Sequence, residues 1–224
     1  MAPRTPKTKR STTQLYAMNE NQGDYIKALE TSSQVVVTGS SGTGKTYVAA
    51  TFAAQMLQAG QIEKIVLTRP NVSVGRDLGY FPGTLLEKIT PWAQPVLEVL
   101  SKHLGKQEVN TYIKEGTIEI APLSTMRGRS FEKAFILLDE AQNATPAEMK
   151  MFLTRIGEDC KLVVNGDIQQ NDLRGNNSGL DQIVDMIERY KLNIPIIEFT
   201  VDDIVRSKIC KDWIIAFDKY ETGG

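Results

Sequence analysis

The residues that point most directly to chemistry form a glycine-rich segment that ends in lysine and threonine. The segment matches the pattern G-x-x-x-x-G-K-[ST] and consists of Gly39, Ser40, Ser41, Gly42, Thr43, Gly44, Lys45 and Thr46. An apolar strand is expected before it, at residues 34–38, and an alanine-rich helix after it, at residues 47–59. Glycines let the backbone wrap around a triphosphate, and the N–H groups at the start of the helix face its negative charge. The pattern predicts a phosphate-binding loop, with Lys45 on the β- and γ-phosphates and the Thr46 hydroxyl on Mg²⁺. The alternative is a glycine-rich turn that only caps the helix.

Two adjacent carboxylates, Asp139 and Glu140, follow the apolar run at residues 135–138. In open α/β sheets, ligands bind at the carboxyl edge of the strands, where these side chains are expected. We assign Asp139 to the Mg²⁺ shell and Glu140 to the orientation or deprotonation of an attacking water. Two acids with separate roles favour hydrolysis over transfer to a second small substrate. The alternative is a pair of surface carboxylates that ends a strand.

Glutamines supply further candidates for nucleotide contacts. Gln170 follows the expected strand at residues 161–165, where its side chain can hydrogen-bond a γ-phosphate and sense its loss, and Gln169 is the second choice. A polar turn without a ligand is the alternative. Gln22 lies upstream of the first strand, and its amide offers both a donor and an acceptor to the edge of adenine. Without a ligand in view, such a residue is more often a solvated helix residue.

Strands and helical segments alternate along the chain. Further strands are expected at residues 64–68, 117–120 and 194–199, and helices at residues 84–104, 146–153, 178–190 and 202–217. Pro91 and Pro95 are expected to break or kink the first of these helices. The alternation predicts an α/β fold with a mostly parallel sheet and helices on both faces.

The N-terminal residues differ from the rest of the chain in composition. Residues 1–17 are polar and contain four basic residues and no acid. We expect a flexible basic tail there, ahead of a single domain at residues 18–224. Contact of the tail with nucleic-acid phosphates is the less favoured alternative.

Composition limits the classes of function. The chain has 224 residues and a net charge of −1, so any nucleic-acid surface must be local. The cysteines, Cys160 and Cys210, form no C-x-x-C pair, and His103 is the only histidine, which excludes histidine-based metal clusters. No apolar stretch is long enough to span a bilayer. We expect a cytoplasmic protein of a bacterium or of a phage-infected cell, without membrane association.

The order of short motifs resembles the PhoH-like family, single-domain P-loop ATPases related to superfamily 1 helicases. The resemblance covers nearly everything after about Met18. Beyond the phosphate loop, it rests on residues 67–70, 78–83, 87–88, 91–92, 121–123, 126–129, 139–143, 149–155, 166–167, 170, 172–173, 178–180 and 203–206. The chain departs from the family at Ser40-Ser41, where Pro-Ala is usual, at Gln169, where a small hydroxyl residue is usual, and at Ser207, where His is common. The resemblance implies ATP binding and hydrolysis, a RecA-like P-loop NTPase fold, ring assembly, and coupling to RNA or single-stranded DNA.

Two segments are candidates for contact with nucleic acid. The loop at residues 68–83 holds cations and aromatics, which bind single strands through phosphate contacts and base stacking; they are Arg69, Arg76, Tyr80 and Phe81. Packing of these aromatics on a neighbouring helix or subunit is an equal alternative. The segment at residues 126–129, with Arg127 and Arg129, is the second candidate, although such a pair is usually solvated or salt-bridged.

The chain holds one set of ATP motifs, whereas the related helicases hydrolyse ATP between two RecA-like domains. An arginine supplied by a neighbour contributes roughly 10³–10⁵ in rate. We therefore expect a homo-oligomeric ring, a hexamer, in which Arg206, and after it Arg174, is the candidate finger; an ordinary salt bridge is the alternative for each.

Three functions follow: a ring ATPase on RNA or single-stranded DNA, a nucleotide or small-molecule kinase, and an ATP-governed switch. The kinase is disfavoured because the sequence offers no second substrate site and no arginine-rich lid, and because Glu140 suits water activation.

Overall fold

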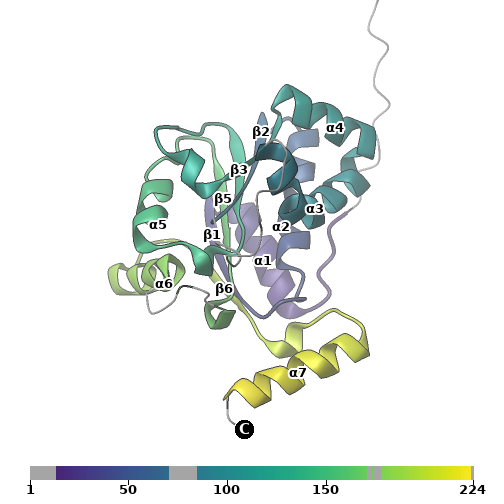
Figure 1. Ribbon diagram of the computed structural model, residues 1–224, viewed down its shortest axis with the longest axis vertical. Coiled ribbons are helices and arrows are strands. Elements are labelled where there is room, and N and C mark those ends of the chain that lie inside the picture. The colour runs from purple at the N-terminus through teal and green to yellow at the C-terminus, as the bar shows by residue number, and fades with distance from the viewer. Residues whose placement is uncertain (1–13, 71–84, 171–172, 174–177, 223–224) are drawn as a thin grey trace, which may run out of the picture.

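The fold is a parallel sheet between two layers of helices (Figure 1). The computed structural model describes residues 14–70, 85–170, 173 and 178–222. Within them, six parallel strands form one sheet in the order β3-β2-β4-β5-β1-β6. The strands are β1 (Gln34–Gly39), β2 (Lys64–Arg69), β3 (Ile118–Pro122), β4 (Ala134–Leu138), β5 (Lys161–Asn165) and β6 (Ile196–Phe199). The predicted α/β fold with a mostly parallel sheet is confirmed.

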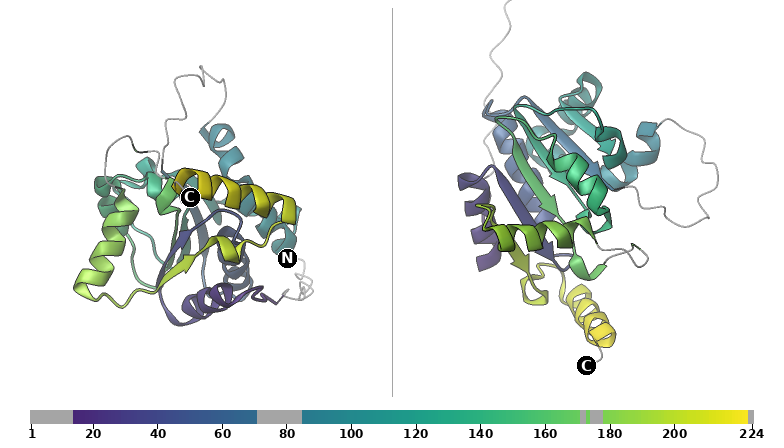
Figure 2. Two further views of the ribbon diagram at one scale, coloured as in Figure 1. Left: turned by 90° about the horizontal axis from the view of Figure 1, so that it is seen from below. Right: turned by 90° about the vertical axis from the view of Figure 1, so that its left-hand side faces the viewer.

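The helices divide between the two faces of the sheet (Figures 1 and 2). One face is covered by α1 (Glu20–Thr31), α2 (Lys45–Gln58), α3 (Leu85–Leu104) and α4 (Lys106–Glu115). The other face is covered by α5 (Pro146–Leu153) and α6 (Gly179–Tyr190). A last helix, α7 (Lys208–Thr222), projects from the body beyond the carboxyl edge of the strands (Figure 1). Short 3₁₀ helices connect these elements: η1 (Leu123–Met126), η2 (Ala141–Asn143), η3 (Ile168–Gln170) and η4 (Val201–Asp203).

Two hydrophobic clusters, one on each face, hold the sheet in place. Val35 and Val37 of β1 belong to the first cluster, with Tyr25 of α1, whereas Val36 belongs to the second, with Phe152 of α5. Side chains alternate between faces along a strand, and both faces are buried, so the strands read as continuous apolar runs. The loops at the carboxyl edge are therefore anchored to strands that are packed on both faces.

The segment at residues 85–115 differs from the prediction. Pro91 and Pro95 lie inside one continuous helix, α3, and do not end it. A buried apolar stripe packs this helix on the body and compensates for the lost hydrogen bonds; it includes Ala93, Val96, Leu97, Leu100 and Leu104. A second helix, α4, which the sequence analysis did not predict, starts after Gly105, where the backbone φ is +95°.

The C-terminal segment also departs from the expected helix at residues 202–217. Thr200 and Asp203 form a capping box around the single 3₁₀ turn η4. Ile204 then turns into the body with 6% exposure, and α7 starts only at Lys208. Tertiary burial of Ile204 thus overrides the local helical pattern. The strand expected from residue 194 begins at Ile196.

Residues just before the predicted boundary at residue 17 contact the body of the protein. Leu15 packs against the first hydrophobic cluster, and Tyr16 lines the cleft described below. Most of the predicted flexible tail, residues 1–13, lies outside the described part of the chain, so the boundary stays a prediction. Among the described helices, none combines the length and the apolar character needed to cross a bilayer.

Candidate active site

A cleft of about 550 Å³ opens at the carboxyl edge of the sheet. Its volume lies in the range of small-molecule sites, roughly 300–1,000 Å³. The lining includes the loop between β1 and α2, the ends of β2, β4 and β5, and a segment just before α7. Residues from distant parts of the chain therefore face one space.

The phosphate loop has the backbone that a phosphate cradle requires. Gly39 and Gly44 adopt φ values of +110° and +89°. A Cβ atom on Gly39 would lie 1.7 Å from the carbonyl oxygen of Phe199, and one on Gly44 would lie 2.7 Å from the Gln22 amide nitrogen. Gly44 is also the N-cap of α2, so the first N–H groups of the helix face the loop. Only glycine fits both positions.

Lys45 bridges two carbonyl groups of the phosphate loop. Its Nζ donates to the carbonyl oxygen of Gly39 at 2.6 Å and to that of Ser40 at 2.8 Å. Burial lowers the pKa of the ammonium group, whereas nearby carboxylates oppose this shift, Asp167 most strongly. Thr43 closes the loop from the other side, since its Oγ1 donates to the Ser40 carbonyl at 3.1 Å. The lysine is thus held where phosphate oxygens can replace carbonyl oxygens as acceptors.

The two acids that follow β4 have different surroundings. The Asp139 N–H extends the sheet by donating to the Thr68 carbonyl at 2.9 Å. Burial raises the pKa of the Asp139 carboxyl to about 6, and Glu140 adds to this rise, while Arg69 and Lys45 oppose it. A cation beside this carboxylate would relieve the same unfavourable burial. Asp139 and the Thr46 hydroxyl thus fit Mg²⁺, which binds one or two protein oxygens together with phosphates and waters.

Glu140 adopts a backbone conformation that is uncommon for its residue type. Its φ of 54° and ψ of 41° are left-handed, and such strain in non-glycine residues of about 1–3 kcal/mol concentrates at functional sites. Its Oε1 lies 3.8 Å from Nη2 of Arg69, and its Oε2 accepts a hydrogen bond of 2.7 Å from the Gln142 amide. Two groups from different elements therefore hold this carboxylate at the cleft.

The turn after β5 separates the two candidate sensors. Gln170 lines the cleft, and its N–H donates to the Asp167 carbonyl at 3.0 Å. Gln169 lines a separate depression beside β6, where its N–H donates to Asp167 Oδ1 at 3.1 Å. Gln170, the preferred sensor, therefore lies at the cleft, whereas Gln169 does not.

Gln22 reaches the cleft from α1. Its side chain is 3% exposed, so the description as a solvated helix residue is wrong. Its Oε1 accepts from the Met18 N–H at 2.9 Å, and its Nε2 donates to the Thr43 carbonyl at 2.9 Å. Gln22 therefore ties the N-terminal segment to the phosphate loop. Tyr16 and Met18, which the sequence analysis missed, line the cleft beside it.

Arg206 lies on the phosphate loop of its own chain. A Cβ atom on Gly42 would lie 2.9 Å from Cγ of Arg206, and the Val205 N–H donates to the Gly42 carbonyl at 3.1 Å. This placement favours action on the same chain's site over the expected action on a neighbour's site. The second candidate finger, Arg174, lies outside the described residues.

The candidate nucleic-acid residues fall into three groups. Arg69 ends β2 and turns to the cleft beside Glu140 rather than to a separate surface. Arg76, Tyr80 and Phe81 lie outside the described residues. The pair Arg127 and Arg129 is split, because only Arg127 is exposed.

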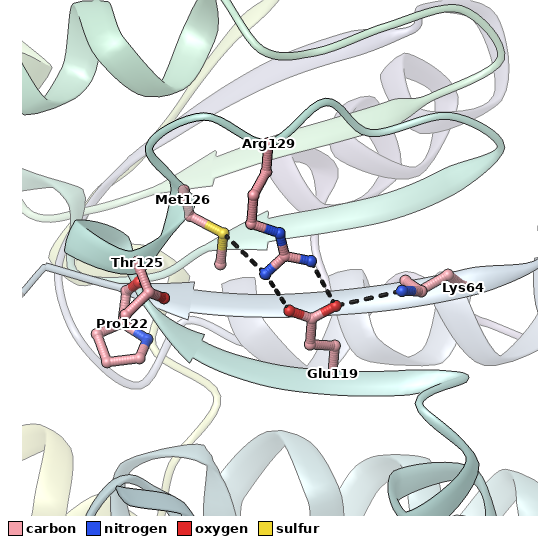
Figure 3. Close-up of polar contacts among 6 residues, drawn as sticks. All are labelled: Lys64, Glu119, Pro122, Thr125, Met126 and Arg129. Carbon is pink, nitrogen blue, oxygen red and sulfur yellow. Dashed lines mark hydrogen bonds and ion pairs between the residues drawn. The ribbon is translucent and has the colours of Figure 1, made fainter.

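Arg129 forms an ion pair with Glu119 of β3 (Figure 3). The guanidinium faces both carboxylate oxygens, with a distance of 2.8 Å between Nη2 and Oε2. Lys64 approaches the same carboxylate at 3.3 Å, and the guanidinium carbon lies 5.2 Å from the ring centroid of Phe131. The salt-bridged alternative thus describes Arg129.

Gln142 is a site residue to which the sequence analysis assigned no role. It is 1% exposed and contacts both Glu140 and the turn after β5. Its position two residues after Glu140 was the only signal available. Within the described residues, no group of three or more His, Cys, Asp or Glu side chains could hold a metal ion.

Comparisons with known proteins agree with this geometry. The profile of the family described as "PhoH-like protein" matches residues 14–218. Protein PhoH of Escherichia coli strain K12 is 42% identical over 211 residues, which cover 93% of this chain and 59% of that protein. The PhoH-like protein of Bacillus subtilis strain 168 is 43% identical over 199 residues, which cover 88% of this chain and 62% of that protein. The chain thus spans about 60% of the length of these relatives.

Among solved structures, the UvsW helicase of bacteriophage T4 has a similar fold. The TM-score is 0.50 at 13% sequence identity, and the match covers 81% of this chain and 59% of that chain. A parallel sheet of RecA-like type, with a phosphate loop after β1 and an acidic pair after β4, is the architecture of a P-loop NTPase. The family match and the identities above show that this chain belongs to the PhoH-like family.

Proposed function

We propose that the chain binds ATP with Mg²⁺ and hydrolyses the bond to the γ-phosphate. The observation that carries the proposal is the Glu140 carboxylate, which Gln142 and Arg69 hold beside Asp139 in the cleft that Lys45 also lines. A base next to the metal ligand and across from the phosphate loop is the arrangement that water attack on a phosphoryl group requires.

Each residue has one task in this proposal. Lys45 exchanges its loop carbonyl acceptors for β- and γ-phosphate oxygens, and the first N–H groups of α2 face the same charge. Asp139 and Thr46 hold Mg²⁺, which neutralises phosphate charge when bound. Glu140 orients the water and accepts its proton, Gln170 contacts the γ-phosphate, and Gln22 recognises the adenine edge. Gln22 must then exchange one of its two internal hydrogen bonds for the base.

Two substitutions test the chemical roles. Lys45→Ala is expected to abolish hydrolysis and weaken nucleotide binding, because a charge-assisted phosphate contact is lost. Glu140→Gln is expected to keep ATP binding and to stop hydrolysis. Glu132→Gln, an exposed glutamate elsewhere, is the matched control. Wild-type turnover in the Glu140→Gln variant would show that Glu140 is not the base.

We also propose that copies of the chain assemble into a homo-oligomeric ring, a hexamer. The support is an apolar stripe on one side of α7, whose residues are 60–86% exposed; they are Ile209, Trp213, Phe217 and Tyr220. Contiguous exposed apolar surface of this kind is typical of interaction sites. Trp213→Ser should shift wild-type assemblies to smaller species in sedimentation velocity, whereas Tyr190→Ser on α6 should not. An unchanged distribution would exclude α7 as the interface.

Coupling to RNA or single-stranded DNA is the third part of the proposal. It rests on the cation and aromatic content of residues 68–83 and on the family resemblance. Because Arg69 faces Glu140, its substitution would confound the test, and Arg76→Ala with Tyr80→Ala is the cleaner variant. Single-stranded RNA should stimulate wild-type hydrolysis, its affinity should fall with salt, and the double variant should lose both effects. Equal stimulation of both proteins would exclude this loop.

An ATP-governed switch is the second candidate function, and one contact favours it. The Val205 N–H bonds the Gly42 carbonyl of the phosphate loop, three residues before the exposed helix α7 begins. In this proposal, a nucleotide on the loop acts through this hydrogen bond on the segment that leads to the apolar stripe. If partner binding through α7 depends on ATP while nucleic acid leaves the hydrolysis rate unchanged, the switch is the better description.

A further inference from the structure

Gln142 occupies a buried position between two parts of the candidate active site. It belongs to η2, directly after Glu140, and is 1% exposed. Its Nε2 donates to Glu140 Oε2 at 2.7 Å, and its Oε1 accepts from the Asp167 N–H at 3.0 Å. Both polar atoms of the Gln142 amide therefore form hydrogen bonds with residues of the site.

The chemistry of the partners fixes which way the amide points. A backbone N–H can only donate, and an ionised carboxylate can only accept. The oxygen of Gln142 must therefore face Asp167, and its nitrogen must face Glu140. A flipped amide would lose both hydrogen bonds at once.

Close packing keeps the hydrogen bond between Gln142 and Asp167 from lengthening. A Cβ atom on Gly166 would lie 2.9 Å from Gln142 Oε1 and 2.5 Å from Cδ2 of Leu180. The turn after β5 thus lies directly on Gln142 and is backed by α6. Because interiors are packed this tightly, a shift of the turn displaces the amide rather than opening a gap.

We infer that Gln142 is a positioning residue that ties the water-activating carboxylate to the γ-phosphate contact. The inference rests on the proposed hydrolysis of ATP. The turn that begins at Asp167 continues through η3 to Gln170, which faces the cleft. A phosphate group held by Gln170 fixes this turn, the turn fixes the Gln142 amide, and the amide fixes Glu140. Departure of the phosphate loosens the same series of contacts.

Arg69 does not replace this link. Its Nη2 lies 3.8 Å from the other oxygen of Glu140, a looser contact than the 2.7 Å hydrogen bond from Gln142. Without the amide, Glu140 keeps a charge partner but loses the group that aims it. A misplacement of about 1 Å at a reacting group can lower the rate by roughly 10²-fold.

The test measures kcat and nucleotide affinity separately. A positioning residue should change kcat alone, whereas a folding defect should change both. Gln142→Met keeps the length of the side chain without its hydrogen bonds, and Gln142→Glu keeps its shape but removes the donor to Glu140. We expect kcat to fall by about 10- to 100-fold in both variants, with the Kd for a fluorescent ATP analogue within about twofold of wild type. Gln182→Met, an exposed glutamine on α6, is the matched control and should behave as wild type.

A double-mutant cycle makes the inference specific. In the Glu140→Asp background, whose shorter carboxylate no longer reaches the hydrogen bond from Gln142, Gln142→Met should lower the remaining rate no further. Wild-type kcat in both Gln142 variants overturns the inference, and so does an equal loss of rate and of nucleotide affinity. An inactive wild-type chain in the same assay would instead contradict the proposed hydrolysis itself.

Discussion

Arg129→Ala distinguishes a structural arginine from a nucleic-acid contact. In the folded protein, Arg129 meets both oxygens of Glu119 and lies over Phe131, while Lys64 approaches the same carboxylate at 3.3 Å (Figure 3). Removing a partner from a buried pair destabilises by about 3–5 kcal/mol. The Arg129 and Glu119 side chains are 36% and 21% exposed, so solvent screening lowers this figure, and Lys64 keeps part of the interaction. We expect a loss of about 2 kcal/mol in the free energy of unfolding.

The pH dependence of this loss has a definite sign. Hydrogen bonding to Arg129 lowers the pKa of the Glu119 carboxyl below its ordinary value, despite burial. A group with a lowered pKa in the folded state stabilises above its unfolded pKa, about 4.3 for Glu, and loses this contribution as pH falls through the folded value. The difference between wild type and Arg129→Ala should therefore be full at pH 7 and shrink below about pH 4.

Urea denaturation at several pH values measures this difference directly. A change of about 2 kcal/mol corresponds to about 4–8 °C in Tm for a domain of this size. Arg127→Ala, which removes the exposed neighbour, is the control and should stay within about 0.5 kcal/mol of wild type. Affinity for single-stranded RNA should be the same in all three proteins. Unchanged stability together with weaker RNA binding would refute the structural reading of Arg129.

Further predictions concern the site itself. Gly39→Ala should destabilise by more than about 3 kcal/mol, since its new Cβ would meet the Phe199 carbonyl at 1.7 Å; thermal unfolding measures this. Mixed oligomers of Lys45→Ala and Arg206→Ala subunits should recover no ATPase activity, because Arg206 lies on its own chain's loop; recovery in demonstrably mixed assemblies would establish action in trans. Asn165→Val should stabilise the nucleotide-free protein by about 1 kcal/mol, because neither amide atom has a partner among the described residues, and a lower urea midpoint would contradict this. Removal of divalent cations with EDTA should stop hydrolysis, and added Mg²⁺ should restore it.

Local patterns were sufficient for most of the sheet. Residues 34–38, 64–68 and 161–165 are apolar runs bounded by polar or turn residues, and each became a strand of the expected type. The sequence pattern predicted the wrong helix boundaries where tertiary burial or a turn set them. α3 continues through Pro91 and Pro95 because one side of it packs on the body, and η4 replaces the start of the expected last helix because Ile204 is buried.

Side-chain partners across the site were beyond the reach of sequence reasoning. Arg69 could be assigned to a nucleic-acid loop because nothing along the chain relates residue 69 to residue 140. The pairing of β2 with β4 places the ends of these strands side by side, and Arg69 then faces Glu140. Gln142 was passed over for the same reason, since its second partner, Asp167, is 25 residues away.

By itself, the sequence determined the phosphate loop, the acidic pair and the alternation of strands and helices, because these depend on residue type and on spacing within about ten positions. The strand order determined which of these residues meet at the site. β5 lies between β4 and β1, so the turn after it reaches both the acids and the phosphate loop. The burial of Ile204 brings Arg206 back onto Gly42 of the same chain, a contact between residues 164 positions apart. Such contacts follow from packing in three dimensions, which no local pattern records.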